Sequence, residues 1–375
     1  MRALHRSCAL VMVAASAVAG GCTNFEDPTA VIDLRMLAVV VQASEVILDA
    51  DLSDPSMPVV DPANNPPLMV APLIVDPHGG GRKVTYTISA CPNDPFAPAP
   101  PGGGQGGGAF PSGGARTTVG SALCDENDPT TWLLTPNPIA AGQSVMVQPT
   151  VDQLTVAFMK DIFPDQYGNL HGGFDLGMPL TLDIKVDAEG EEIRAVKRVL
   201  YWARRIDDAQ VPNQKPTIDS VSFFYERDDA TFDPVDQPQV VVHDPGADYD
   251  LDVKPGATSV WVLPAKGNAE SFETTVVDPD THLAVPYTVP RETLRYRFFA
   301  TAGTFSPAIT SSEPETGFTA TGPIHIESEY RLPSANQIAF DSAGHAVVAI
   351  WIVVRDDRGG ESWQQRNLRI TVPPR

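Results

Sequence analysis

Residues 179–202 read PLTLDIKVDAEGEEIRAVKRVLYW, and their pattern establishes the fold class. Leucine, isoleucine and valine at the even positions of 180–186 alternate with polar side chains at the odd positions, as in a strand with one buried face. The segment DAEGEE at 187–192 supplies a turn, and IRAVKRVLYW at 193–202 runs back. The stretch therefore predicts a β-hairpin.

A second hairpin is predicted near the C-terminus. Its first strand is AVVAIWIVV at 346–354, its turn is RDDRGG at 355–360, and SWQQRNLRITV at 362–372 returns. The first strand is apolar at both even and odd positions. Because such a strand has no polar face to present to water, we expect it at the centre of a sheet that is covered on both sides.

Two further segments indicate an internal repeat. GRKVTYTISACP at 81–92 and ETLRYRFFATAG at 292–303 are both strand-like and carry aromatic residues, one segment in each half of the chain. Between the halves, DDAQVPNQKPT at 207–217 is polar and contains prolines, which is typical of a linker. IDSVSFFY at 218–225 then reads as the first strand of the second half.

The proline and glycine content also favours a β-rich architecture. The chain has 36 prolines and 29 glycines, which argue against long helices and favour short strands joined by irregular loops. We therefore expect an all-β protein with two antiparallel immunoglobulin-like β-sandwiches in tandem. The expected domains are residues 31–206 and 216–373, with a linker at 207–215.

The N-terminus reads as an export signal. Residues 1–21 combine two arginines with the apolar run ALVMVAASAVAGG at 9–21, which is too short to span a bilayer. The small residues before Cys22 resemble the lipobox of bacterial lipoproteins, and this resemblance implies that Cys22 is acylated and becomes the mature N-terminus. Residues 22–30 would then be the tether, and Thr23 in place of aspartate favours the outer over the inner membrane. Ordinary signal cleavage, which would leave Cys22 as a free thiol, is the alternative.

The chain as a whole resembles bacterial surface lipoproteins with tandem immunoglobulin-like domains. YRFFATAGTFS at 296–306 and AIWIVVRDDRGG at 349–360 carry this resemblance. It implies a sandwich fold and a role in display or adhesion, and it supplies no catalytic residues.

The charge of the chain argues against one class of partner. The formal net charge of −21 repels nucleic acid, so no nucleic-acid partner is expected.

Cys91 and Cys124 are expected to form a disulfide in an oxidising compartment. The bond would close the proline- and glycine-rich loop at 92–123.

Sequence motifs for catalysis are absent. The chain contains no HExxH, GxSxG, P-loop or strand-to-helix GxGxxG pattern. The segment HDPGADYDLD at 243–252 is the one candidate cofactor site, for Ca²⁺, because alternate carboxylates of an extended segment share a face. Its candidate ligands are Asp244, Asp248, Asp250 and Asp252. The alternative is that these aspartates form surface turns.

These observations predict a non-enzymatic, lipid-anchored protein of the cell envelope. It would display its domains, periplasmically or at the surface, for binding, adhesion or a structural role. Its partners would be the membrane, through the lipid, and an envelope protein or carbohydrate. A tethered or secreted hydrolase with dispersed acidic residues and a calcium-stiffened scaffold are the alternatives.

Overall fold

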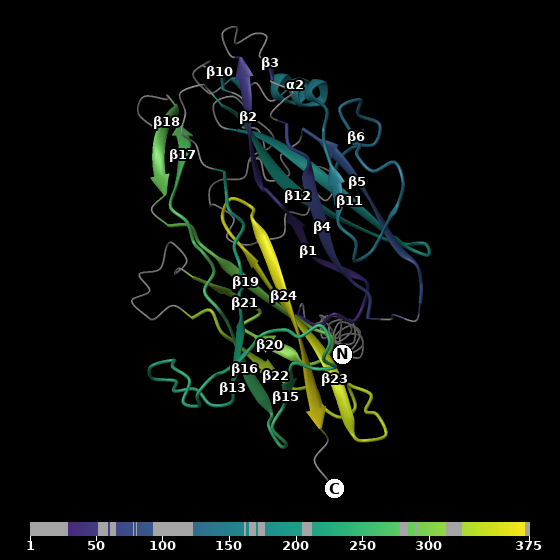
Figure 1. Cartoon of the computed structure of the whole chain (residues 1–375), viewed down its shortest axis with the longest axis vertical. Coiled ribbons are helices and arrows are strands. Elements are labelled where there is room, and N and C mark those ends of the chain that lie inside the picture. Colours follow the sequence, from purple (N-terminus) through teal and green to yellow (C-terminus); the bar gives the residue numbers. More distant parts are fainter. Residues whose placement is uncertain are drawn as a thin grey trace, which may run out of the picture.

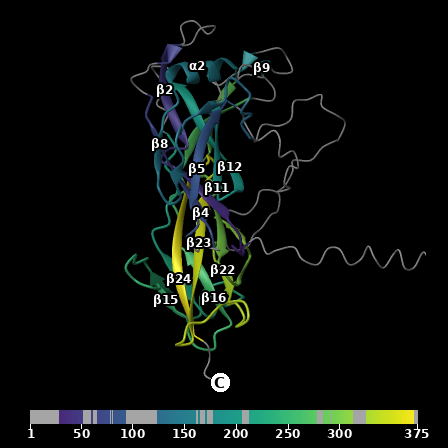
Figure 2. The same cartoon turned by 90° about the vertical axis from the view of Figure 1, so that its right-hand side faces the viewer.

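The computed structural model describes residues 29–51, 59–60, 65–77, 79, 81–92, 123–160, 163–164, 170–171, 177–204, 212–277, 284–289, 291–312 and 325–371. The expected signal peptide, Cys22, most of the tether, the centre of the 92–123 loop and the start of the 207–215 linker lie outside these residues. The described chain is mostly β-structure, drawn out along one axis with the first half at one end and the second half at the other (Figures 1 and 2).

The first half consists mainly of two sheets. The smaller sheet is antiparallel, in the order β1 (Arg35–Val41), β4 (Leu68–Val75) and β8 (Val145–Val147). The larger has the order β3 (Val59–Val60), β2 (Glu45–Asp51), β12 (Glu191–Arg204), β11 (Met178–Ala188), β5 (Val84–Cys91) and β6 (Trp132–Leu133), and β7 (Ile139–Ala140) also pairs with β5. β9 (Phe163–Pro164) and β10 (Leu170–His171) form a separate pair. Side chains from the three-stranded sheet, such as Val70, and from the seven-stranded sheet, such as Ile88, meet in one hydrophobic core.

The second half has two five-stranded sheets around a separate core. One sheet has the order β14 (Gln239–Val241), β13 (Val221–Phe224), β16 (Ser259–Pro264), β22 (Ser328–Arg331) and β20 (Thr304–Ser306). The other has the order β15 (Leu251–Asp252), β24 (Glu361–Thr371), β23 (His345–Arg355), β19 (Arg295–Ala300) and β21 (Ile309–Ser311). β17 (Phe272–Val277) and β18 (Ala284–Val289) form a hairpin of their own.

The two halves repeat one strand order. In each half, the first strand (β1 or β13) pairs with β4 or β16. A later segment (β2 or β15) pairs in parallel with the last strand, β12 or β24. The last strand then pairs with β11 or β23, and that strand pairs with β5 or β19. The correspondence expected between 81–92 and 292–303 is therefore confirmed, because their strands β5 and β19 hold the same place.

Both predicted hairpins are present. β11 pairs over its whole length with residues 191–201 of β12, and the turn residues Glu189 and Gly190 have φ angles of 53° and 98°. Two successive positive φ angles are what a two-residue hairpin turn of the favoured twist requires, and glycine accepts this backbone readily. β23 and β24 form the second hairpin around the turn at 356–360.

β23 is covered on both faces, as its apolar pattern predicts. Ile350 and Ile352 point into the core of the second half. Trp351 and Val353, on the opposite face, pack with Leu37 and other apolar residues of the first half in a third cluster. Figure 1 shows β1 beside the upper end of β24, where the halves meet. The unusual pattern of this strand therefore reflects an interface between the halves.

One helix departs from the all-β expectation. α2 (Val151–Lys160) begins with a capping box, in which Thr150 Oγ1 accepts a hydrogen bond from the Gln153 amide and Gln153 Oε1 accepts one from the Thr150 amide. Leu154 and Phe158 on its inner face are buried in the core of the first half. Within the described residues, no helix is long and apolar enough to cross a membrane.

The expected disulfide is present. Cys91, the last residue of β5, is bonded to Cys124 with a Cα–Cα distance of 5.7 Å. Both cysteines are buried against β11, where the Cys124 amide donates to Oδ2 of Asp183. The bond therefore joins the large sheet of the first half to the segment that follows the proline- and glycine-rich loop.

Candidate functional site

The aspartates proposed as calcium ligands engage separate partners. Asp250 is buried, with Oδ1 3.0 Å from Nδ1 of His243 and Oδ2 accepting a hydrogen bond from the Asn367 amide at 2.6 Å. Asp252 forms an ion pair with Arg369 on the neighbouring strand β24.

The remaining two aspartates belong to the turn that precedes β15. Asp244 accepts a hydrogen bond from the Gly246 amide, as a turn-forming aspartate does, and Asp248 is exposed. The structure thus does not bring the four carboxylates together. In the part of the chain that is described, no group of three or more His, Cys, Asp or Glu side chains is arranged to hold a metal ion. Calcium binding stays a prediction.

A hollow of about 370 Å³ lies on the outer face of the β13–β16–β22 sheet. Strand alternation creates its floor. Val221 and Phe223 point into the core, so Ser220 and Ser222 point outward, and the residue paired with Ser222 on β16 is Leu263. One wall is formed by 231–234 and the other by 325–327, with Lys266 at the margin. Its volume falls in the range of small-molecule sites.

A stack of four side chains holds the wall at 231–234 against the sheet. The Arg227 guanidinium lies 4.2 Å from the ring centre of Trp261 and 4.4 Å from that of Phe232. Phe232 also contacts His325, with ring centroids 4.0 Å apart and ring planes tilted by 43°. Cation–π contacts of this kind each contribute about 0.5–2 kcal/mol.

Phe232 has a backbone that phenylalanine rarely adopts. Its φ angle is 60°, in the left-handed region, which costs a non-glycine residue about 1–3 kcal/mol. The amide of Phe232 donates to the carbonyl of Asp228 at 2.5 Å, and its ring contacts Arg227 and His325. Strain retained in this way is more frequent at functional sites than elsewhere.

Two buried polar atoms of the wall at 325–327 have no hydrogen-bond partner among the described residues, namely Oε1 of Glu327 and Nε2 of His325. Nε of Arg227 also lacks one, but Arg227 lies behind the wall and does not line the hollow, and its Nε is 3.8 Å from Oδ1 of Asp229. The Glu327 side chain is only 7% exposed, and its Oε1 lies 2.9 Å from Nδ1 of His325 and 3.5 Å from Nη1 of Arg227 without hydrogen-bond geometry. Native structures rarely leave buried polar atoms unpaired, so their gathering beside one hollow marks a site that a ligand can complete.

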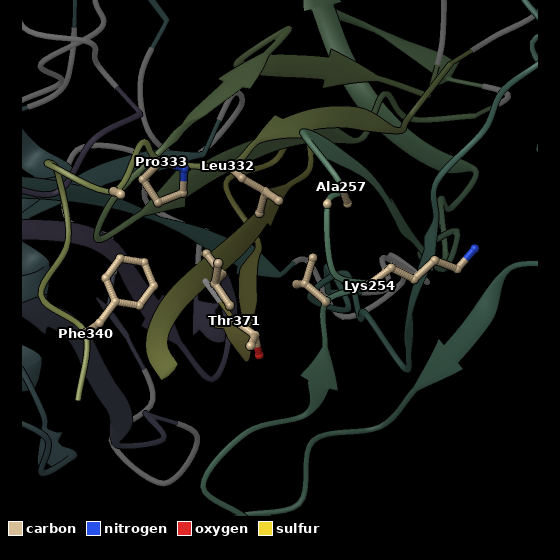
Figure 3. Close-up of a pocket in the computed structure, with 10 residues that line it drawn as sticks. Lys254, Ala257, Leu332, Pro333, Phe340 and Thr371 are labelled. Carbon is tan, nitrogen blue, oxygen red and sulfur yellow. The ribbon is translucent and has the colours of Figure 1, made fainter. Parts of the chain in front are cut away.

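A second hollow is smaller and less polar. It measures about 130 Å³ and lies between the end of β24 and the segments 253–257 and 332–340. Figure 3 shows Leu332, Pro333, Phe340 and Thr371 around it, with the Lys254 side chain extending away from the others. Its volume is below the usual range of ligand sites, so the larger hollow is the better candidate.

A network of buried charges at the junction of the halves is the other polar cluster. Arg358, on the turn between β23 and β24, lies 3.1 Å from Glu45, 2.6 Å from Glu270 and 3.4 Å from Glu292. Burial and the nearby carboxylate of Asp356 raise the pKa of Glu292 to about 7.

The same network includes residues of the first half and of the linker. Lys197 Nζ lies 3.0 Å from Oε2 of Glu361, and the Asn213 side chain donates to Asp356 and to Ser44. Because most of these groups are buried and paired with one another across the junction, we interpret the network as the structural joint between the halves. Asn213, inside the expected linker, is part of this joint.

Sequence reasoning did not identify the hollow. His325 is an isolated histidine, and Arg227 and Glu327 lie 100 positions apart, so no local pattern joins them. The only available signal was the loop ERDDATFDPVD at 226–236, which reads equally well as a surface turn. The aromatic pair Tyr201 and Trp202, a possible stacking surface for carbohydrate, is buried.

Comparison of the sequence with protein-family models and with curated proteins finds no match. Function is therefore argued from the site and from the sequence alone.

Proposed function

We propose that this chain is a lipid-anchored, non-enzymatic binding protein of the bacterial cell envelope. The hollow on the β13–β16–β22 sheet is the observation that carries the binding role. It combines a ligand-sized volume, a strained residue and two buried polar atoms that have no hydrogen-bond partner among the described residues. A surface that served only to keep the protein in solution would need none of these features.

We further propose that both halves are immunoglobulin-like sandwiches. The repeated strand order supports this assignment. In each half the first strand (β1 or β13) lies in one sheet and a later segment (β2 or β15) lies in the other sheet, parallel to the last strand, while the other strand pairs of these sheets are antiparallel. Two sheets with this order around one core are the architecture of immunoglobulin-like domains.

Anchoring through an acylated Cys22 is supported by the apolar run and the small residues that precede it. Thr29 and Val31 exchange backbone hydrogen bonds with Ala300 of β19, close to the junction of the halves. Residues 22–28 can span at most about 25 Å, so the lipid would hold the molecule by its middle. Two acyl chains or more give a stable anchor where a single chain is marginal.

The intact mass of the N-terminal peptide tests the anchoring. It is measured from membrane and soluble fractions for the natural chain and for Cys22→Ser, with Thr23→Ser as a control that keeps the cysteine. We expect an acylated peptide that begins at Cys22 in the natural chain and in the control, and loss of membrane retention in Cys22→Ser. An unmodified N-terminus in the soluble fraction would contradict the proposal.

A tethered hydrolase is the second candidate, and one observation favours it. Glu327 lies against His325 beside a hollow that also exposes Ser220 and Ser222, the residue types of a nucleophile with its base and orienting acid. Among the described residues, however, no hydroxyl is hydrogen-bonded to Nε2 of His325. Hydrolysis of a nitrophenyl ester that is lost in His325→Ala would establish this alternative, and its absence supports the binding role.

A further inference from the structure

We propose that the hollow and the adjacent edge strand β14 together bind an extended, cationic peptide segment of a partner protein. This inference rests on the proposed binding function and names its ligand class. Three independent features support it, namely the open strand edge, the charge around the hollow and the unpaired atoms in its wall.

The strand edge provides the first argument. Within the described residues β14 is the outermost strand of its sheet, next to β13. Val240 is 63% exposed and Val242 is 70% exposed, whereas valine is among the residues that are most often buried in folded proteins. Val240 is paired with Ser222, which lines the hollow, so the exposed valines and the hollow share one face. An edge strand of this kind can accept an extended chain as a further strand.

The length of this edge is limited by two prolines. Pro238 precedes β14 and Pro245 follows it, and proline has no amide hydrogen to donate to a neighbouring strand. The accessible edge therefore lies within residues 239–243, because the amide of Asp244 already donates to Oδ1 of Asp250. A bound segment would pair through a few residues only, and most of its specificity would come from side chains that reach the hollow.

Charge provides the second argument. The segment 226–236 contains five acidic residues and one basic residue, Arg227, whose guanidinium lies between Trp261 and Phe232. Asp233 is exposed at the hollow itself. Lys266 also lines the hollow and offsets part of this charge, but the five acidic residues of the adjacent segment and the formal net charge of −21 still attract a positively charged partner and repel an acidic one.

The unpaired atoms provide the third argument. Glu327 and His325 both line the hollow, and Oε1 of the first and Nε2 of the second lack a hydrogen-bond partner among the described residues. An extended peptide presents N–H and C=O groups side by side, so it can pair with both. A saccharide also carries donors and acceptors, but it has no charge to match the acidic rim and no alternating apolar groups for Val240 and Val242. These differences favour the peptide.

Fluorescence anisotropy with labelled hexapeptides tests the proposal on the purified full chain. The probes are a lysine–valine alternating peptide and a glutamate–valine alternating peptide, with a neutral chitin tetrasaccharide as an unlabelled competitor. We expect the lysine–valine peptide to bind with an affinity that falls as salt rises, and the glutamate–valine peptide to bind at least ten-fold more weakly. We expect no competition from the saccharide.

Variants locate the binding. Glu327→Gln and Asp233→Asn should each weaken the lysine–valine peptide by about three- to ten-fold, which corresponds to about 0.7–1.4 kcal/mol. Asp233→Asn is on the exposed rim, so it keeps the test valid if Glu327→Gln alters folding. Val240→Ser should also weaken binding. Its matched control is Val347→Ser, on the opposite sheet and 52% exposed, which should leave binding unchanged.

Several results would overturn the inference. These are equal binding of the two hexapeptides, binding of the saccharide in their place, or lysine–valine binding that none of the site variants changes. Failure here is distinct from failure of the anchoring proposal. A chain that is acylated at Cys22 but does not bind the peptide loses only the ligand class, and a chain that binds the peptide without acylation loses only the anchor.

Discussion

Removing one partner of the buried ion pair between Lys197 and Glu361 should strongly destabilise the junction of the halves. Their side chains are 6% and 1% exposed, and Nζ lies 3.0 Å from Oε2. Burial lowers the pKa of Lys197. For Glu361, burial opposes ionisation, but the charges of Lys197 and Arg355 outweigh it and lower the pKa. Oε2 of Glu361 also accepts a hydrogen bond from the Val39 amide of the first half.

Lys197→Met removes the ammonium group and keeps the apolar stem. Loss of one partner from a buried pair destabilises a protein by about 3–5 kcal/mol, because a buried charge is left uncompensated. Arg355, 2.7 Å from Oε1 of Glu361, retains part of the compensation, so we expect a loss of about 3 kcal/mol in the free energy of unfolding. A pair of similar length on the surface, Lys185 with Glu192, is 41% and 43% exposed and should contribute less than about 1 kcal/mol.

Urea unfolding of the full chain measures both losses, with Lys185→Met as the matched control. A double variant, Lys197→Met with Glu361→Gln, removes the remaining charge and should be more stable than the sum of the two single losses predicts. The reasoning would be refuted by a Lys197→Met variant that loses no more stability than Lys185→Met. Strictly additive losses in the double variant would refute it as well.

Three further predictions concern the same junction and the first half. Glu292 has a folded-state pKa of about 7 against an ordinary 4.5, so its contribution to stability is complete below about pH 4.5 and is lost as pH rises through 7. The Glu292→Gln variant should therefore be more stable than the natural chain at pH 8, by up to about 3 kcal/mol. Its free energy of unfolding in urea should also depend less on pH between pH 5 and 8, and a pH dependence equal to that of the natural chain would contradict the prediction. The double variant Cys91→Ser with Cys124→Ser should lower the free energy of unfolding by about 3–4 kcal/mol, because the bond closes a loop across a sequence separation of 33. Reduction of the natural chain should cause the same loss, and a natural chain whose stability does not change on reduction would contradict the presence of the bond. Trp351→Ala should cost about 3–5 kcal/mol in thermal or urea unfolding, as expected of a buried interface tryptophan, and a loss below 1 kcal/mol would show that the halves do not pack through it.

Local patterns in the chain predicted its strands and its covalent link. The hairpin at 179–202 follows from alternation and from a turn whose Gly190 has a positive φ, and both signals lie within a few residues of one another. The disulfide followed from the two cysteines that remain after the N-terminal segment. The helix α2 was missed although its capping box, Thr150 with Gln153, is also local. The surrounding strand signals outweighed a motif of only four residues.

Contacts between distant residues account for what local patterns could not show. The apolar pattern of 346–354 required a cover on both faces, but only the fold identifies β1 and its neighbours as the second cover. Lys197 stands in the core-facing register of Ala195 and Val199, and a charge is retained there because Glu361 of the other half pairs with it. Arg227, Phe232, His325 and Glu327 meet at the hollow from separate segments. Secondary structure in this protein thus depends on neighbours along the chain, whereas its buried charges and its candidate site depend on packing across long sequence separations, which leaves no periodic signal.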